Sequence, residues 1–535
     1  MHSLWTGTTL ALTCALLCVA HAHAQVWPEQ LQPQLPFASL RHRPPVDHNA
    51  DYARFDDEQV FRLDVSSLEQ LKQLEAAVET HNLDLWSHLR IGSVDVRVPV
   101  QKLDLFQSAT ASIPSTVMIP DLQQLVSEQT SPSLLHARQG EWNFTDNSFW
   151  LKYHDFATLN NFTETMVQQF PDLVKRVSIG HTYEGREVFG MSIHGFKAKK
   201  DKKKKKPEKS RKGRSWFADE DNEDEDQLDD EEMQDDNEGL QLGGETEFDK
   251  EVNAWWSWLF GHSRKSSKKP SKPKKNPKAI IIHAGQHARE WIGPAVVSYI
   301  AKELILGYRH NKKITRLVDQ FEFVIVPVLN ADGYVFTWEH NRMWRKNRQP
   351  TSIPFCPGID PNRNWGYMWN TGGSSSNPCN EGYHGPEAFA ALEAKMMSDY
   401  ILQRKNVVAY IDLHSYAQLW MSPFGGDCSK IPKDDEDIME GSMGAAKALH
   451  DVHGKKYSVG SVCSLIYQSS GGSIDWTYAE ANVKYSYSIE LRDTGRHGFL
   501  LPEDEILPSS EETMAGIMYL ANFIRKREKQ WGYLV

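Results

Sequence analysis

The stretch Ile280-Ile-Ile-His-Ala-Gly-Gln-His287-Ala-Arg-Glu290-Trp-Ile-Gly-Pro294 decides the fold. Its β-branched beginning is typical of a buried strand, and the apolar spacing at its end is typical of a helix. His287 and Glu290 therefore stand where a strand ends and a helix begins. Residues 406–414 form a second apolar run, which ends on His414. Because open α/β sheets place ligands beyond the carboxyl ends of their strands, the two segments are predicted to meet in one crevice.

His287, Glu290 and His414 would give that crevice a metal site. Two imidazoles and a carboxylate leave the fourth tetrahedral position open for water, which distinguishes catalytic zinc from closed structural zinc. A His-x-x-Glu pair by itself is more often a surface pair, so this interpretation depends on its surroundings. The three residues together predict a zinc hydrolase with one Zn²⁺ per chain.

The rest of the C-terminal part alternates apolar runs with helical stretches, and this pattern predicts an α/β sheet covered by helices on both faces. The predicted strands include residues 322–329, 406–411 and 485–490, and the predicted helices lie near 293–305, 386–403 and 510–526.

Seven motifs in this part of the chain occur in the order found in one known family. They are His287-Ala-Arg-Glu-Trp, Asn330-Ala-Asp-Gly-Tyr, Arg342-Met-Trp-Arg345-Lys, Asp360-Pro-Asn362-Arg363-Asn-Trp, His414-Ser-Tyr, Ile466-Tyr467-Gln-Ser-Ser-Gly-Gly-Ser-Ile474-Asp-Trp and Ile489-Glu490-Leu-Arg-Asp-Thr-Gly. From about Asn147 to the C-terminus, apart from one insertion, the chain resembles the zinc metallocarboxypeptidases of the carboxypeptidase A type. The resemblance implies a mixed, mainly parallel central sheet and a small α+β propeptide domain.

The resemblance also implies a role for individual residues. His287, Glu290 and His414 match the zinc ligands, and Asp360 matches the carboxylate that fixes the tautomer of a ligand histidine. Glu490 matches the general base, and Arg345 matches the oxyanion stabiliser. The matching substrate positions are Arg289, Asn362, Arg363, Ser415, Tyr416, Tyr467 and Ile474. A guanidinium suits a C-terminal carboxylate because its rigid fork pairs in two places at once.

Amide hydrolysis near neutral pH requires these same groups. Zinc lowers the pKa of a water molecule to about 7, and a carboxylate such as Glu490 can then accept its proton. A secreted fungal subgroup of the family is carboxypeptidase-like but inactive, and its members depart from the pattern at the general-base position. The glutamate here favours activity. The alternative is an inactive carboxypeptidase-like protein involved in cell wall organisation.

Ile474 matches the floor of the side-chain pocket, where an acidic residue marks a preference for C-terminal lysine or arginine in the family. An aliphatic floor predicts an apolar or aromatic C-terminal residue. The simpler interpretation is that Ile474 only packs the core.

The N-terminal part is predicted to be processed. Residues 1–24 have a short apolar segment and a small-residue cleavage pattern, as in a signal peptide. We assign residues 25–138 to a propeptide whose activation domain spans about 50–125, followed by a metallocarboxypeptidase domain at 139–535. The segment Ser66-Ser-Leu-Glu69 is expected to open a helix as a capping box, with Leu68, Leu71, Leu74 and Val78 as its apolar stripe. Arg138 is a candidate release site.

The cysteines and sequons agree with a secreted protein, although a vacuolar destination stays open. Outside the signal segment, Cys356, Cys379, Cys428 and Cys463 allow three pairings. The resemblance suggests Cys356 with Cys379, which leaves Cys428 and Cys463 either paired or free. Asn143 and Asn161 begin sequons for N-glycosylation.

Residues 197–278 form a charged insertion. Twelve Lys/Arg accompany two acids between residues 197 and 214, and eighteen acids accompany one lysine between 219 and 251. Blocks of like charge with few apolar residues cannot bury a core, so disorder is expected. The opposite blocks can neutralise each other, and we expect no nucleic acid as a partner. Wall or polyanion binding is an alternative. We expect the chain to be a monomer without a membrane span. Its expected partners are peptide or protein C-termini and an activating protease.

Overall fold

The computed structural model describes residues 52–87, 89–130, 144, 148–195 and 277–530. The predicted signal segment, the release site at Arg138, the sequon at Asn143 and residues 197–276 of the insertion lie outside the described residues. No helix within the described part is long and apolar enough to cross a membrane.

An eight-stranded mixed sheet organises the larger part of the chain, in the order β11-β10-β12-β9-β7-β8-β6-β5. Its four middle strands, β12, β9, β7 and β8, are mutually parallel, whereas the pairs β10–β12, β6–β8 and β5–β6 are antiparallel. The strands span Val174–His181 (β5), Glu187–Ile193 (β6), Lys278–Ala284 (β7), Phe321–Val326 (β8), Val407–His414 (β9), Leu419–Ser422 (β10), Ser458–Ser461 (β11) and Tyr485–Glu490 (β12). The expected α/β class with a mixed, mainly parallel sheet is confirmed.

Strand β7 shows why this sheet is covered on both faces. Successive strand side chains point to opposite faces, and all three isoleucines at its centre are buried. Ile280 and Ile282 belong to the core that includes helices α8 and α15, whereas Ile281 belongs to the core that includes α11 and α14. A continuous apolar run is therefore the pattern that a doubly covered strand requires.

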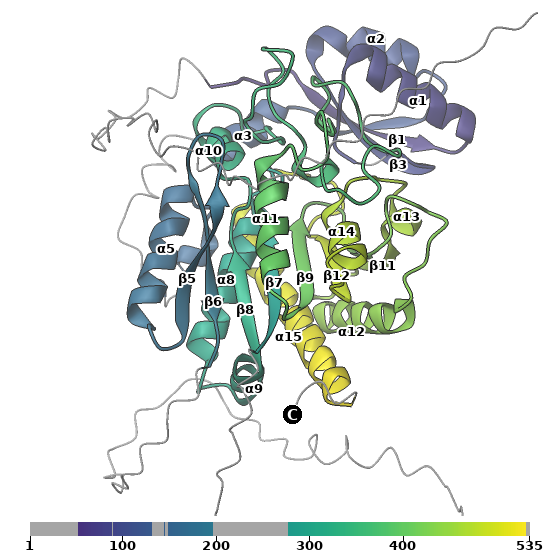
Figure 1. Ribbon diagram of the computed structural model, residues 1–535. Helices are drawn as coiled ribbons and strands as arrows, with labels where there is room; N and C mark the ends of the chain where they lie inside the picture. Colours follow the sequence, from purple (N-terminus) through teal and green to yellow (C-terminus); the bar gives the residue numbers. More distant parts are fainter. Residues whose placement is uncertain (1–51, 88, 131–143, 145–147, 196–276, 531–535) are drawn as a thin grey trace, which may run out of the picture. The chain divides into compact units, whose positions relative to one another are not determined.

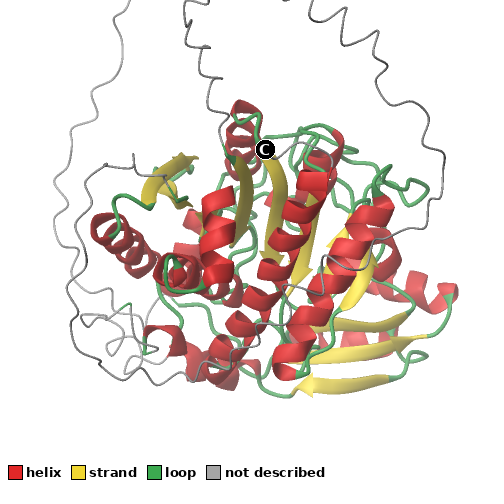
Figure 2. Ribbon diagram, turned by 90° about the horizontal axis from the view of Figure 1, so that it is seen from below, coloured by secondary structure: helices red, strands yellow, loops and turns green. Residues whose placement is uncertain are grey.

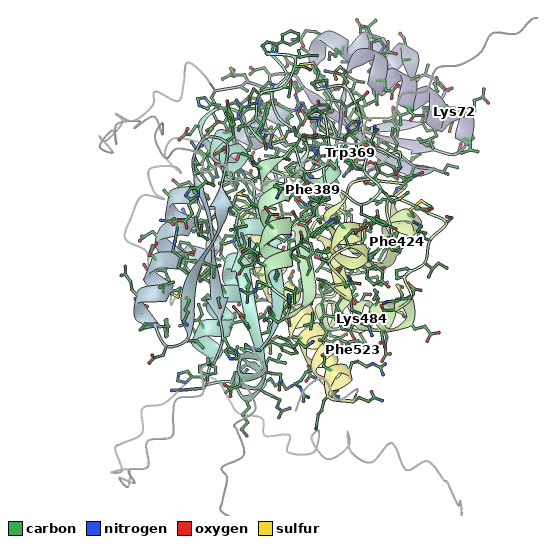
Figure 3. All side chains as sticks on the ribbon, in the orientation of Figure 1. Lys72, Trp369, Phe389, Phe424, Lys484 and Phe523 are labelled. Atoms are coloured by element: carbon green, nitrogen blue, oxygen red, sulfur yellow. A yellow bond between two sulfur atoms is a disulfide. The ribbon has the colours of Figure 1, made fainter. Side chains whose placement is uncertain are left out.

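Helices lie on both sides of the strands, as Figures 1 and 2 show from two directions. Phe424 packs against Tyr478 of α14 with ring centroids 5.5 Å apart, and Phe523 of α15 packs edge-on against Tyr485 of β12 (Figure 3). The helices span Phe156–Gln169 (α5), Ile292–Gly307 (α8), Lys312–Gln320 (α9), Ala331–Glu339 (α10), Leu392–Gln403 (α11), Asp435–His453 (α12), Val462–Leu465 (α13), Ser473–Ala479 (α14) and Ile506–Gln530 (α15). The disulfide Cys356–Cys379 joins two loops and confirms the expected pairing. The disulfide Cys428–Cys463 joins a loop to helix α13, so these two cysteines are paired and not free.

The N-terminal region forms a small antiparallel sheet of order β2-β3-β1-β4 with its own apolar core. Its elements span Gln59–Val65 (β1), Leu68–His81 (α1), Asp84–Leu85 (β2), Gly92–Val98 (β3), Leu103–Ala109 (α2), Ser115–Ile119 (β4) and Leu122–Thr130 (α3). The expected combination of a helix with alternating strands is present.

Two details of helix α1 differ from the prediction. The N-cap is Ser67, whose hydroxyl accepts from the Gln70 backbone N–H at 3.2 Å, so the cap lies one residue later than the expected box. The Gln70 side chain accepts a hydrogen bond from the Ser66 backbone N–H, whereas the predicted capping box gave this role to the Glu69 side chain. Leu68 is 67 % exposed and does not belong to the apolar stripe, because it is the first residue of the helix and faces solvent.

Candidate metal centre and active site

The three predicted metal ligands meet at one buried point. His287 follows strand β7, Glu290 precedes helix α8, and His414 is the last residue of β9. The His287 and His414 Nδ1 atoms lie 2.8 and 3.0 Å from the Glu290 carboxylate oxygens and 3.1 Å from each other. Zinc bonds of about 2.0–2.1 Å would place tetrahedral ligand atoms roughly 3.3 Å apart. The donor set and its spacing thus fit a zinc ion.

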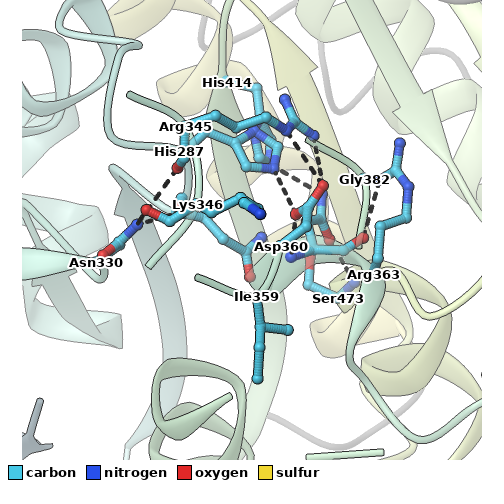
Figure 4. Close-up of polar contacts among 12 residues, drawn as sticks. His287, Asn330, Arg345, Lys346, Ile359, Asp360, Arg363, Gly382, His414 and Ser473 are labelled. Carbon is cyan, nitrogen blue, oxygen red and sulfur yellow. Dashed lines mark hydrogen bonds and ion pairs between the residues drawn. The ribbon is translucent and has the colours of Figure 1, made fainter. Parts of the chain in front are cut away.

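Asp360 lies directly behind His287 (Figure 4). Its Oδ1 is 3.1 Å from His287 Nε2, and its Oδ2 accepts from Arg345 Nη2 at 2.9 Å. Burial alone would raise the pKa of Asp360, but the charges of Arg345 and His287 hold it well below its usual value. A carboxylate that stays ionised fixes the proton of His287 on Nε2 and leaves Nδ1 for a metal.

Arg345 lies in an irregular segment that Asn330 holds in place. The Asn330 side-chain amide caps helix α10 by accepting from the Gly333 N–H, and it donates to the Lys346 carbonyl at 3.0 Å (Figure 4). The Arg345 carbonyl in turn accepts from the Ala288 N–H. These hydrogen bonds connect the segment that carries Arg345 to the turn that carries His287. The Arg345 guanidinium therefore faces the metal site from a fixed position.

Glu490 ends strand β12 beside His414 in the neighbouring parallel strand. Its side chain is buried, and within the described part of the chain its Oε2 has no hydrogen-bond partner. Burial raises the pKa of Glu490 to about 8, partly offset by His414. A buried carboxyl group with an unpaired oxygen beside the metal triad is suited to general acid–base catalysis.

Asn362 and Arg363 follow Asp360 in the short 3₁₀ helix Pro361–Arg363. Arg363 Nη2 donates to the Tyr467 hydroxyl at 3.3 Å, and Arg363 Nη1 donates to the Asn362 carbonyl. Arg363, Asn362 and Tyr467 therefore form one polar group.

One cavity is lined by Asn362 and Arg363, by the metal ligands His287 and Glu290, and by a recess of several apolar side chains. Ile474 on α14 is 3 % exposed and lines the recess. Asp475 lines it too, but its oxygens accept from the Gly425 and Gly426 backbone N–H groups at 2.7–3.0 Å. Further lining residues are Leu419, Met421, Val462, Ile466 and Ser488.

Arg289 and Tyr416 are both engaged by the N-terminal region. Arg289 donates to both Asp84 oxygens at 2.8 and 3.0 Å, and the Tyr416 hydroxyl donates to Asp95 at 2.8 Å. Asp95 is paired at both oxygens with Arg62. Two expected substrate positions thus contact the predicted activation domain.

Sequence reasoning missed several residues of this site. Asp84 and Asp95 were not assigned, nor was Trp86, whose ring packs against Phe499 at 5.0 Å. Asp412, which lies within the predicted strand that ends on His414, was not assigned a function either. Ser415, an expected substrate position, lines the same cavity as the metal ligands, and its backbone N–H donates to Glu290 at 3.2 Å.

This combination of sheet, ligands and carboxylate-binding arginine defines a metallopeptidase-type site. Residues 159–218 and 254–516 match the family model described as zinc carboxypeptidase, and residues 61–129 match that of the carboxypeptidase activation peptide. The chain belongs to the zinc carboxypeptidase family.

Named relatives are of two kinds. The chain is 31 % identical to the inactive metallocarboxypeptidase ECM14 of Ajellomyces dermatitidis, over 88 % of this chain and 73 % of that protein. It is 34 % identical to carboxypeptidase A2 of Mus musculus, over 88 % and 94 %. Among solved structures, thrombin activatable fibrinolysis inhibitor superposes with a TM-score of 0.67 at 26 % identity, covering 88 % of this chain and all of that one.

Proposed function

We propose that this protein is a secreted, zinc-dependent carboxypeptidase, made as a zymogen, that removes apolar or aromatic C-terminal residues. The observation that carries the proposal is Glu490, a buried carboxylate with a free oxygen beside the His287–Glu290–His414 triad. A protein that only bound peptides would not need a proton acceptor at this point.

When bound in the triad, zinc would supply a Lewis acid and activate a water molecule for attack. Glu490 accepts the proton of the attacking water and passes it to the departing amine nitrogen. Arg345 lies on the side of Glu290, with its Nη1 3.8 Å from that carboxylate, and stabilises the negative charge that develops on the carbonyl oxygen. Arg363, Asn362 and Tyr467 hold the terminal carboxylate, which restricts cleavage to the last peptide bond.

The recess supports a preference for apolar or aromatic side chains. Ile474, which matches the floor position of the family's pocket, lines the cavity, and the neighbouring Asp475 carboxylate accepts from the Gly425 and Gly426 backbone N–H groups. Burial raises the pKa of Asp475 to about 6. Apart from the metal ligand Glu290 and the proposed base Glu490, the described cavity lining therefore offers a lysine or arginine side chain no carboxylate that lacks hydrogen-bond donors, and leaving its charge unpaired there is unfavourable.

The N-terminal region would act as an inhibitor until it is cleaved. Asp84 accepts from Arg289, and Asp95 accepts from the Tyr416 hydroxyl. Arg90 donates to the Leu465 carbonyl at 2.9 Å. Trp86, Ser87 and Arg90 line the same cavity as the metal ligands. A peptide approaching Arg289 would have to displace these contacts. Secretion is supported by the two disulfides, because such bonds persist in oxidising compartments.

A second candidate is an inactive carboxypeptidase-like protein, which the printed name of the ECM14 relative favours. Release of C-terminal residues from a panel of peptides separates the two. After cleavage of the activation region, we expect chelator-sensitive release of phenylalanine, tryptophan or leucine. Complete inactivity of zinc-loaded, cleaved protein on all C-terminal residues would favour the inactive candidate.

A further inference from the structure

Asp412 is a fully buried carboxylate that lies behind the second histidine of the triad. It precedes His414 by two residues on strand β9, so both side chains point to the same face of the sheet. Asp412 Oδ2 lies 3.0 Å from His414 Nε2. The corresponding distance from Asp360 to Nε2 of His287 is 3.1 Å. Each histidine of the triad therefore has a carboxylate at the nitrogen that faces away from the metal.

The position of the proton on His414 follows from its surroundings. Nδ1 faces Glu290 and His287, so in a metal-bound protein the proton belongs on Nε2. The Asn362 side-chain nitrogen lies 3.3 Å from the same Nε2, but it is a donor. Its assignment is fixed because the Asn362 oxygen accepts from the Ser473 backbone N–H at 2.9 Å. The Asp412 carboxylate is then the acceptor for the His414 proton.

Asp412 is itself held by donors from two other segments. Its Oδ2 accepts from the Ser473 hydroxyl at 2.6 Å and from the Gln286 side-chain amide at 2.7 Å. The Gln286 oxygen accepts from Trp365 Nε1 at 3.1 Å, which fixes the orientation of that amide. His283 Nε2 lies 3.4 Å from the other Asp412 oxygen. The carboxylate thus has one defined position in the core.

We propose that Asp412 is a positioning residue for the metal centre, which fixes the tautomer and ring orientation of His414 and increases the basicity of its Nδ1. This inference rests on the proposed zinc site but not on peptidase activity. Partners of this kind typically change metal affinity by about 10- to 100-fold. We therefore expect the Asp412→Asn variant to bind zinc about 10- to 100-fold more weakly, because amide nitrogen and oxygen replace an ionised acceptor of fixed geometry.

The test measures the zinc dissociation constant of the full-length protein by competition with a chromophoric chelator. Asp412→Asn and Asp360→Asn are compared with Glu393→Gln, a buried carboxylate on α11 that is bonded to Asn347 and lies outside the triad and its partners. Both aspartate variants should weaken zinc binding, and Glu393→Gln should leave it unchanged. Melting temperatures of the metal-free proteins separate a loss of metal affinity from a loss of folding.

A dissociation constant for Asp412→Asn within about threefold of the wild-type value would overturn the proposal. If that variant does not fold, Ser473→Ala removes the hydroxyl that holds Asp412 and keeps the carboxylate. A measurable weakening of zinc binding by Ser473→Ala would support the proposal, and unchanged binding would overturn it. A wild-type protein that binds no zinc would refute both the metal site and the role of Asp412.

Discussion

Replacing Glu490 with glutamine tests the proposed chemistry most directly. The substitution keeps the shape of the side chain but removes the proton acceptor beside His414. Because Oε2 has no hydrogen-bond partner within the described residues, the change breaks no bond there, and the melting temperature should stay close to that of the wild type. General acid–base catalysis contributes roughly 10²–10⁴ in rate, so turnover should fall by at least that factor. This loss corresponds to roughly 3 to 5 kcal/mol in the activation barrier.

The assay compares kcat and KM of cleaved, zinc-loaded protein on a peptide ending in phenylalanine. Glu393→Gln serves as the control because it changes another buried carboxyl group in the same way. Zinc content and KM should be nearly unchanged in Glu490→Gln while kcat falls. Equal turnover by Glu490→Gln and the wild type would refute the role of Glu490 as general base. If both proteins are inactive on every C-terminal residue, the inactive candidate is correct.

Three further substitutions test inhibition, pH dependence and specificity. Asp84→Asn removes the charge that pairs with Arg289 and should raise the activity of the uncleaved protein at least about tenfold, because breaking a buried ion pair typically costs about 3–5 kcal/mol. Asp56→Asn, at an exposed position, is the control. Equal activities of the Asp84→Asn variant and the wild type would contradict the inhibitory contact. Burial raises the pKa of Glu393 from its ordinary value of 4.5 to about 7, so its contribution to stability is greatest below pH 4.5 and declines as the pH rises to 7. At 1.36 kcal/mol per pKa unit the decline is about 3 kcal/mol, and chemical denaturation should show a smaller loss of stability between pH 5 and 8 for Glu393→Gln than for the wild type. Ile474→Asp should shift kcat/KM toward C-terminal arginine and lysine by at least about tenfold relative to phenylalanine, and an unchanged ratio would show that Ile474 only packs the core.

Features set by neighbouring residues in the chain were predictable from the sequence. The buried β-branched run before His287 forms strand β7, because a strand covered on both faces requires apolar residues at every position. The metal triad followed from a motif at the end of that strand and from a second strand that ends on His414. The error at helix α1 is also local, since two adjacent serines offer two possible caps and only the structure shows that Ser67 is used.

Contacts between distant segments were not predictable in the same way. Asp84 lies on a two-residue strand, too short for a periodic signal, and its partner Arg289 is more than two hundred residues away. The sequence pattern predicts only that Asp412 is part of a buried strand. Its hydrogen-bond donors are Gln286, in the turn before His287, and Ser473, at the start of helix α14. A charged residue within an apolar strand that ends on a metal ligand is the signal that would have identified it.

Overall similarity does not separate an active enzyme from an inactive relative here. The identities to the protein named inactive and to carboxypeptidase A2 are 31 % and 34 % over the same share of the chain. The residues of this chain's own site are more informative. Glu490 is buried without a hydrogen bond to its Oε2 within the described residues, an arrangement that generally costs stability. Glu393 also has an unpaired buried oxygen in the described part of the chain, but Glu490, unlike Glu393, lies beside His414 of the metal triad, and this position indicates a catalytic role. Glu490 and Arg345 together therefore support catalysis rather than peptide binding alone.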